Sequence, residues 1–155
     1  MGELKVRFLR ATEQDADELM SVQNAAFADD LRKYGECPAV CEHRDVMLRW
    51  MQSGFYYKML SDSEIVGTMD VRRRSETHYH LRVLAVHPDW QNTGLGSAAL
   101  QFLFDQHRDV TMWTLITPKD NARNCHFYEK AGFVAIEDQV HSDLLTLVWY
   151  QRGEE

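Results

Sequence analysis

The sequence contains few cysteines and no long hydrophobic run. Three cysteines are an odd number, and a chain of 155 residues buries enough surface to fold without disulfide bonds or a structural metal. No stretch reaches the ~18 apolar residues that a membrane helix requires, and residues 1–5 do not resemble the start of a secretory signal. We therefore expect one domain over residues 1–155, in a cytoplasmic protein without a membrane partner.

Metal ligands do not occur at the spacing of a metal site. Cys37 and Cys41 are four residues apart and His43 follows them, but a zinc site requires a second pair of ligands at similar spacing. The neighbouring Cys125 and His126 fall on a predicted helix. We therefore expect no bound metal.

Basic residues are outnumbered by acidic ones. The formal net charge is −7, and the basic run at residues 72–74 is short. A nucleic-acid binder usually has a basic face, so nucleic acid is not an expected partner. An acidic surface can attract a cationic amine, but it serves solubility equally well.

Apolar residues alternate along some segments and recur at helical spacing in others, which is typical of an α/β protein. Thr12 and Asp15 have the spacing of a capping box at the start of the first helix. Residues 29–41 include Gly35 and Pro38 and are expected to be a loop or a broken helix. The patterns predict strands over residues 4–11, 55–60, 65–74, 78–86, 110–117, 133–136 and 144–150, and helices over residues 12–28, 94–107 and 121–131 and around residues 46–51.

A glycine turn follows the predicted strand 78–86. Gly94 and Gly96 lie where a helix begins, so backbone N–H groups can approach an anion closely. Gln91 and Ser97 add polar side chains to the same segment. The pattern predicts a phosphate or pyrophosphate site, although a glycine turn that only allows tight helix packing has the same sequence appearance.

Two motifs resemble those of the GNAT superfamily of acetyl-CoA-dependent N-acetyltransferases. The first is an apolar-Ala-Val-x-Pro strand end followed by Gln/Arg-x-x-Gly-x-Gly/Ala, which residues 85–88 and 91–96 match. The second is Asn-x-x-Ala/Asn-x-x-Phe/Leu-Tyr-x-Lys-x-Gly-Phe, which residues 121–133 match. The resemblance covers about the whole chain. It implies a GNAT-like α/β fold, with a central mixed, mostly antiparallel sheet of about six to seven strands and about four flanking helices.

The resemblance also implies a role for each matched residue. The backbone of Leu84 and Val86 would pair with the acetyl-pantetheine arm, and Asn121 and Asn124 would contact that arm. The N–H groups of residues 92–97 would hold the pyrophosphate. The implied acetyl-CoA site comprises Leu84, Ala85, Val86, Gln91, Asn92, Thr93, Gly94, Leu95, Gly96, Ser97, Asn121, Asn124 and Tyr128.

Direct transfer requires an acid and a base. The departing thiolate needs a proton or a hydrogen bond, and the resemblance places Tyr128 near the thioester sulfur to supply it. The alternative is that Tyr128 is a core tyrosine packed by Phe127 and Phe133. Both interpretations are compatible with the sequence.

The sequence indicates the general base less clearly than the acid. The strand before the glycine turn lacks the glutamate of many family members, and its sequence resembles serotonin N-acetyltransferases, which have a His-Leu-His pair there. His80 matches the first histidine, whereas Arg82 replaces the second and cannot act as a base. We expect His80, with help from His78, to accept the proton with a pKa of ~6–7.5, unless it is only a partly exposed strand residue. Asp70 and Glu76 are weaker candidates.

These observations predict an enzyme that transfers the acetyl group of acetyl-CoA to a primary amine of a small molecule or a peptide. The alternative is an acetyl-CoA-binding sensor or interaction module of the same fold without catalysis, because the usual glutamate is missing. Residues 27–41 are expected to roof the acceptor site. Trp149 and Tyr150 are expected to line it or to form a homodimer contact.

Overall fold

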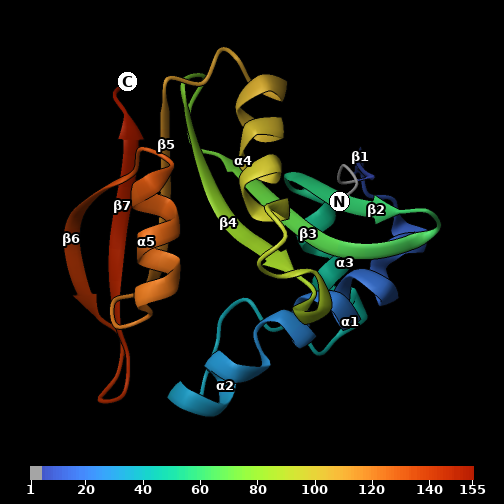
Figure 1. Ribbon diagram of the computed structural model, residues 1–155, viewed down its shortest axis with the longest axis horizontal. Coiled ribbons are helices and arrows are strands. Elements are labelled where there is room, and N and C mark those ends of the chain that lie inside the picture. Colours follow the sequence, from blue (N-terminus) through green and yellow to red (C-terminus); the bar gives the residue numbers. More distant parts are fainter. Residues whose placement is uncertain (1–4) are drawn as a thin grey trace.

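A sheet of seven strands forms the centre of the protein in the computed structural model, which describes residues 5–155 (Figure 1). The strand order is β1-β2-β3-β4-β5-β7-β6, and the neighbouring strands are antiparallel except for β4 and β5. The apolar strand before the glycine turn is β4, at the centre. The strands are β1 (Val6–Arg10), β2 (Phe55–Ser61), β3 (Glu64–Arg73), β4 (His78–Val86), β5 (Met112–Pro118), β6 (Val134–Val140) and β7 (Thr146–Gly153).

Helices cover both faces of this sheet. α4 and α5 pack on one face, in front of the sheet in Figure 1, against buried residues such as Leu81, Trp113 and Tyr150. α1 and α3 pack on the other face, around Tyr56. The α-helices in the described part of the chain are α1 (Ala16–Ala26), α2 (Ala28–Tyr34), α3 (Arg44–Gln52), α4 (Leu95–Gln106) and α5 (Ala122–Lys130), with short 3-10 turns at Glu13–Asp15 and Pro88–Trp90.

The helical segment predicted over residues 12–28 begins just after Thr12, as expected, but α1 ends at Ala26, before the predicted end. The backbone N–H of Thr12 donates to the Asp15 carboxylate at 2.8 Å, which is the return bond of a capping box. The helical path breaks at Phe27, and α2 follows as a separate helix, so part of segment 29–41 is helical. Gly35 ends α2 with a φ of +74°, in the left-handed region that favours glycine.

β4 and β5 separate after a short paired stretch. Residues 78–80 of β4 pair with residues 112–114 of β5, and β5 then continues beside β7. On the other side of β4, the register against β3 shifts so that Arg82 has no residue opposite it. Such a bulge bends its strand. Beyond it, residues 84–86 have no strand partner on the β5 side among residues 5–155.

This architecture confirms the expected fold class, a mixed and mostly antiparallel sheet flanked by helices. The predicted first strand includes Leu4, which lies outside the described residues, and is observed from Val6 onward. β6 runs to Val140, beyond its predicted end, because pairing with β7 continues through residues that are exposed and have no apolar pattern. Within residues 5–155, no helix is long and apolar enough to cross a membrane.

Candidate active site

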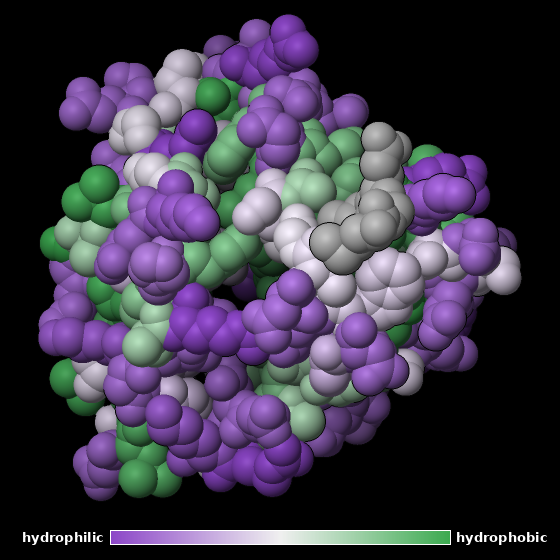
Figure 2. Space-filling view, viewed as in Figure 1, coloured by the Kyte–Doolittle hydropathy of each residue, from purple (hydrophilic) through white to green (hydrophobic). Residues whose placement is uncertain are grey.

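A cleft of about 660 Å³ opens where β4 and β5 separate. Its floor is the unpaired end of β4, and its walls come from the glycine turn, α5 and the junction of α1 with α2. Figure 2 shows a hollow near the middle of this face, bordered by hydrophilic side chains. The lining includes every implied acetyl-CoA residue except Thr93, namely Leu84, Ala85, Val86, Gln91, Asn92, Gly94, Leu95, Gly96, Ser97, Asn121, Asn124 and Tyr128.

The glycine turn has the backbone geometry of an anion cradle. Gly94 has a φ of +85° at the N-cap of α4, and Asn92 has a φ of +63°. The first N–H groups of a helix have no partner within the helix, so they are available to an anion. Gly96 serves a second purpose, because a Cβ there would lie 3.1 Å from the ring of Phe127. Both interpretations of the glycines, anion approach and tight packing, are thus compatible with the structure.

Gln91 connects the glycine turn to two other walls of the cleft. Its Nε2 donates to the backbone carbonyl of Val86 at 3.1 Å, and its Oε1 accepts from Arg123 of α5 at 2.9 Å. Thr93, in contrast, turns its hydroxyl to the carbonyl of Trp90 and does not line the cleft. Gln91 therefore fixes the turn relative to β4 and α5.

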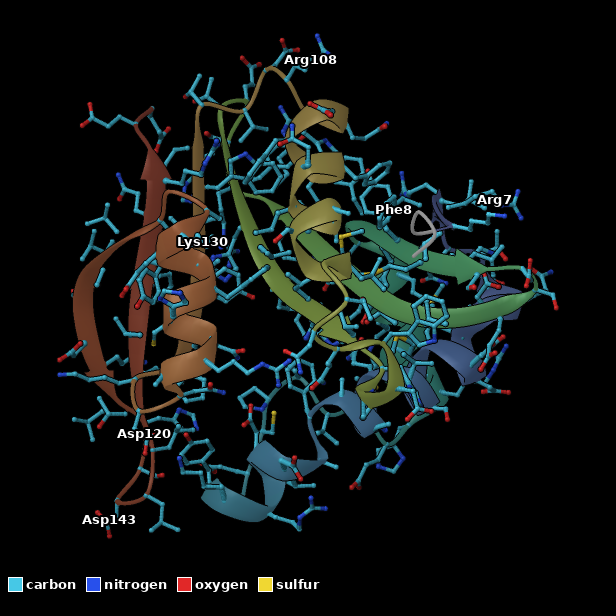
Figure 3. All side chains as sticks on the ribbon, viewed as in Figure 1. Arg7, Phe8, Arg108, Asp120, Lys130 and Asp143 are labelled. Carbon is cyan, nitrogen blue, oxygen red and sulfur yellow. The ribbon has the colours of Figure 1, made fainter. Side chains whose placement is uncertain are left out.

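α5 brings positive charge to the cleft, and of its basic residues the second motif includes only Lys130. Arg123, His126 and Lys130 line this wall, and Figure 3 shows Lys130 at the far end of α5 from Asp120. Their helical spacing on the predicted helix 121–131 was a usable signal, because residues three and four apart share a helix face. The charges of Arg123 and Lys130 on this wall suit a ligand that carries several phosphates.

Tyr128 places its side chain between the core and the cleft. The residue is 9% exposed and lines the cleft beside Leu84. Burial raises the pKa of its hydroxyl, so the phenol stays protonated and can donate at neutral pH. Among residues 5–155 the hydroxyl has no hydrogen-bond partner, although the ring packs against Phe127 and Phe133 as a core tyrosine would.

The structure does not bring His78 and His80 into this cleft. They lie in the paired part of β4, and the hydroxyl of Thr114 on β5 bridges them, 2.8 Å from His78 Nε2 and 2.9 Å from His80 Nδ1. His80 is 4% exposed, and its ring lies 5.6 Å from that of Trp149. Burial, followed by the charges of nearby basic groups, lowers the pKa of His80 to about 4. This value is below the range of ~6–7.5 that the sequence suggested.

Metal-ligating side chains do not gather at the cleft. No three of the histidine, cysteine and acidic side chains in residues 5–155 are placed to hold a metal ion. The thiol of Cys41 lies 3.5 Å from the backbone carbonyl oxygen of His43. The polar groups that line the cleft are backbone amides, the Tyr128 phenol, side-chain amides, the Ser97 hydroxyl, the His126 imidazole and charged side chains.

Comparison of the sequence with known protein families assigns the chain to one of them. The sequence profile of the acetyltransferase (GNAT) family matches residues 21–133. The chain belongs to this family. Both motifs of the GNAT protein lie within the matched segment, and the second ends with it at residue 133. The activity of the family is acetyl transfer.

Relatives and solved structures agree with this assignment. The chain is 31% identical over 142 residues to YrkN of Bacillus subtilis (strain 168), an uncharacterized protein, with 88% of this chain and 77% of YrkN covered. It is 28% identical over 147 residues to S-(2-succino)cysteine N-acetyltransferase of the same strain, with 88% of each chain covered. The structure of a GNAT family acetyltransferase from Elizabethkingia anophelis with acetyl-CoA bound matches with a TM-score of 0.72 at 12% identity, over 98% of this chain and 100% of that one. At this identity, the structural likeness shows a shared fold.

Proposed function

We propose that this GNAT protein transfers the acetyl group of acetyl-CoA to a primary amine of a small molecule or a peptide. One observation carries the proposal: the unpaired end of β4, the glycine turn and Tyr128 line a single cleft. An elongated ligand that ends in phosphates at one side and in a thioester at the other needs all three.

The residues of the cleft fit acetyl-CoA as the donor substrate. Residues 84–86 have no strand partner on the β5 side, so the backbone groups that face this side suit the amide groups of the pantetheine arm, which would add to the sheet edge like a strand. One of these groups, the Val86 carbonyl, already accepts from Gln91 Nε2. The left-handed Gly94 and the first N–H groups of α4 suit the pyrophosphate. Arg123 and Lys130 on the α5 wall add positive charge for the phosphates.

Tyr128 is the group proposed to assist the departing thiolate. Its hydroxyl remains protonated at neutral pH because burial raises its pKa, and it is free to donate because it has no partner among residues 5–155. A hydrogen bond or a proton from this phenol would stabilise the charge that develops on sulfur.

His80, Thr114 and His78 are proposed to carry the proton of the acceptor away; because neither histidine lines the cleft, the proton would have to reach them through water. His80 is neutral at pH 7, so its ring can accept a proton, but a pKa of about 4 makes it a poor place for the proton to remain. The Thr114 hydroxyl can accept a hydrogen bond from one imidazole and donate to the other, which links His80 to His78. His78 Nδ1 lies 3.8 Å from the Glu155 carboxylate, which is half exposed to solvent.

The experiment is a thiol-release assay with acetyl-CoA over a panel of primary amines, peptides and amino acids. The panel includes S-(2-succino)cysteine, because a relative with 28% identity is named for that acceptor. We expect thiol release that depends on the amine, with one acetyl group added to the amine in the mass spectrum. Tight acetyl-CoA binding without turnover of any acceptor would contradict the enzyme and support the sensor.

A further inference from the structure

The central sheet has two free edges, which lie at opposite ends of the molecule (Figure 1). β1 and β6 are the outermost strands, so within residues 5–155 each pairs with another strand on one side only. The outer N–H and C=O groups of an edge strand can pair with a strand of another chain. The cleft is not lined by residues of β1 or β6, so pairing at either edge leaves the donor site open.

The β6 edge is apolar and acidic. Large apolar side chains that are more than half exposed occur, in the described part of the chain, only on β6 and in the loop after it; they are Val134, Ile136, Val140 and Leu144. Figure 2 shows hydrophobic atoms along the side of the molecule where Figure 1 places β6. Residues 134–144 include no lysine, arginine or proline, the residues that commonly protect an edge strand. Asp138 pairs with Lys119, whereas Glu137 has no ion pair within residues 5–155.

The β1 edge is basic. Lys5, Arg7 and Arg10 lie in or just before this strand and are exposed. Arg10 is held over the rings of Phe55 and Tyr57, at 4.9 and 5.8 Å from their centres. Arg7 has no ion pair among the described residues, and Figure 3 shows it at the outer side of the molecule. The two edges of one sheet therefore carry opposite charges.

The directions of the edge strands allow one copy to continue the sheet of the next. The pairings across the sheet make β1 and β6 run in opposite directions. A second copy placed beside the first without being turned over therefore brings its β1 antiparallel to β6. Antiparallel strands can exchange a full ladder of backbone hydrogen bonds.

Arg7 and Glu137 project from the same face of the sheet. Phe8 stacks on Phe102 of α4, with ring centres 5.1 Å apart, so the neighbouring Arg7 points to the face opposite α4. Glu137 pairs with Trp149 of β7, and the next residue of β7 packs on the face that α5 covers. Glu137 therefore also points away from the helices α4 and α5.

The register of β7 on β6 shows how a β1 strand would fit on the outer side. Glu137 and Val134 lie opposite positions two residues apart on β7, because a bulge separates them. Arg7 and Leu9 are also two residues apart. A β1 strand that repeats this register sets Arg7 opposite Glu137 and Leu9, which is 38% exposed, opposite Val134. An opposite-charge pair and an apolar pair across adjacent strands both stabilise a sheet.

Pairing of like edges is disfavoured by charge. A symmetric β6–β6 pair centred on the strand would place the acidic residues 137–138 of one copy beside those of the other. A β1–β1 pair would bring two basic strands together. Like charges on adjacent strands are destabilising, so charge complementarity favours β1 against β6.

We propose that the β6 edge binds the β1 edge of a second copy of this chain, so that the protein associates head to tail into a continuous sheet. This inference does not depend on the proposed acetyl transfer. Because the two edges lie at opposite ends of the molecule, each added copy presents a new free edge. Association therefore continues beyond two copies, into a ring or an open chain.

Sedimentation velocity of the full chain over a range of concentrations tests the association. The average mass of wild type should rise with concentration beyond that of two copies. Glu137→Lys and Arg7→Glu each place like charges across the interface, so each should weaken association at least about tenfold. In an equimolar mixture of the two variants, alternating copies restore an opposite-charge pair at every interface, and the mixture should associate about as strongly as wild type.

Arg108→Glu and Asp109→Lys are matched controls. They reverse the same charges at exposed positions of the loop after α4, which belongs to neither edge strand. Both should associate as wild type does, and circular dichroism checks that every variant is folded. The proposal is overturned if wild type stays monomeric, if its mass stops at two copies, or if the controls weaken association as much as the edge variants. It is also overturned if the mixture of folded Glu137→Lys and Arg7→Glu stays dissociated.

Hydrogen exchange locates the contact. At concentrations where wild type associates, amide exchange in residues 6–10 and 134–140 should be slower than in Glu137→Lys or Arg7→Glu alone at the same concentration. The ladder between the two edges is the physical reason, because it occupies outer N–H groups that are otherwise open to solvent. Association with unchanged exchange in both segments would show that another surface is used and would overturn the proposal.

Discussion

Arg82, the residue at which the register of β4 shifts, donates a hydrogen bond from its Nε to the carboxylate of Asp70 on β3. Asp70 is fully buried, and its second oxygen accepts from Arg72 at 2.9 Å. The Arg82 guanidinium also lies 3.6 Å from the centre of the Trp50 ring of α3. Arg82 at the bulge thus contacts both β3, through Asp70, and α3, through Trp50. Asp70 was a weaker candidate for the general base in the sequence, and both of its carboxylate oxygens accept hydrogen bonds from arginines.

Asp70→Asn should lower both stability and affinity for acetyl-CoA. The variant leaves two partly buried guanidinium groups without their counter-charge, which costs roughly 3–5 kcal/mol in the free energy of unfolding. Because the pair lies at the β3–β4 bulge, directly before the unpaired end of β4, the folded variant should also bind acetyl-CoA more weakly. Urea unfolding and calorimetry measure the two effects.

Asp15→Asn is the control for that variant. Asp15 pairs with Lys58 at 2.9 Å, away from the cleft lining, so its loss should reduce stability but not affinity for acetyl-CoA. If folded Asp70→Asn binds acetyl-CoA as wild type does, the Asp70–Arg82 pair does not position the edge of β4.

Tyr128→Phe should lower kcat by ~10²-fold and change the KM for acetyl-CoA much less. The fold should tolerate the change, because the hydroxyl has no partner among residues 5–155 that would be left unpaired. Tyr150→Phe is a matched control: this buried tyrosine lies next to Tyr128, with ring centres 6.4 Å apart, and its hydroxyl binds Glu129 outside the cleft. Equal kcat values for Tyr128→Phe and wild type would show that the Tyr128 hydroxyl does not assist the departing thiolate.

His80 should stay neutral down to about pH 4, which NMR titration of its ring protons measures directly. Its pKa in the folded protein is lower than its unfolded value of ~6.5, so its contribution to stability is complete above pH ~6.5 and is lost as the pH falls toward 4. The loss is on the order of 3 kcal/mol and should be absent in His80→Gln.

The catalytic role of His80 has a separate readout. His80→Gln and Thr114→Val both interrupt the link between His80 and His78, so each should lower kcat/KM at pH 7, by ~10²-fold for His80→Gln. If protonation of His80 affects kcat/KM, the resulting change in kcat/KM with pH should occur near pH 4, the pKa of His80. An unaltered pH profile in His80→Gln would reject His80 as the proton acceptor.

Local sequence patterns predicted much of the fold and of the lining of the cleft. The helix start at Thr12 and the start of α4 just after Gly94 depend on neighbours in sequence, and the structure has them where the patterns predict. The register shift at Arg82 could not be predicted, because it depends on Asp70 of another strand and on Trp50 of a helix on the opposite face. The alternation of β4 gives no sign of it.

The catalytic groups also depend on contacts between residues that are distant in the sequence. The bridge from His80 to His78 passes through Thr114, which lies far away in the sequence and belongs to no motif. The low pKa of His80 follows from burial, which the strand pattern did not reveal. The start of α2 lines the cleft, although its residues belong to a segment expected to be a loop or a broken helix. The contact of Tyr34 at the end of α2 with Asp120 joins positions 86 residues apart, which no local pattern reveals.

The most direct test of the donor site is a calorimetric titration of acetyl-CoA into wild type, Gly94→Val and Gly35→Val. Both glycines are left-handed, with φ of +85° and +74°, so valine imposes similar backbone strain at each, but only Gly94 lines the cleft. We expect Gly94→Val to lose most of the affinity while it remains folded by circular dichroism, and Gly35→Val to bind acetyl-CoA as wild type does. Wild-type affinity in folded Gly94→Val would contradict the assignment of the pyrophosphate to this turn.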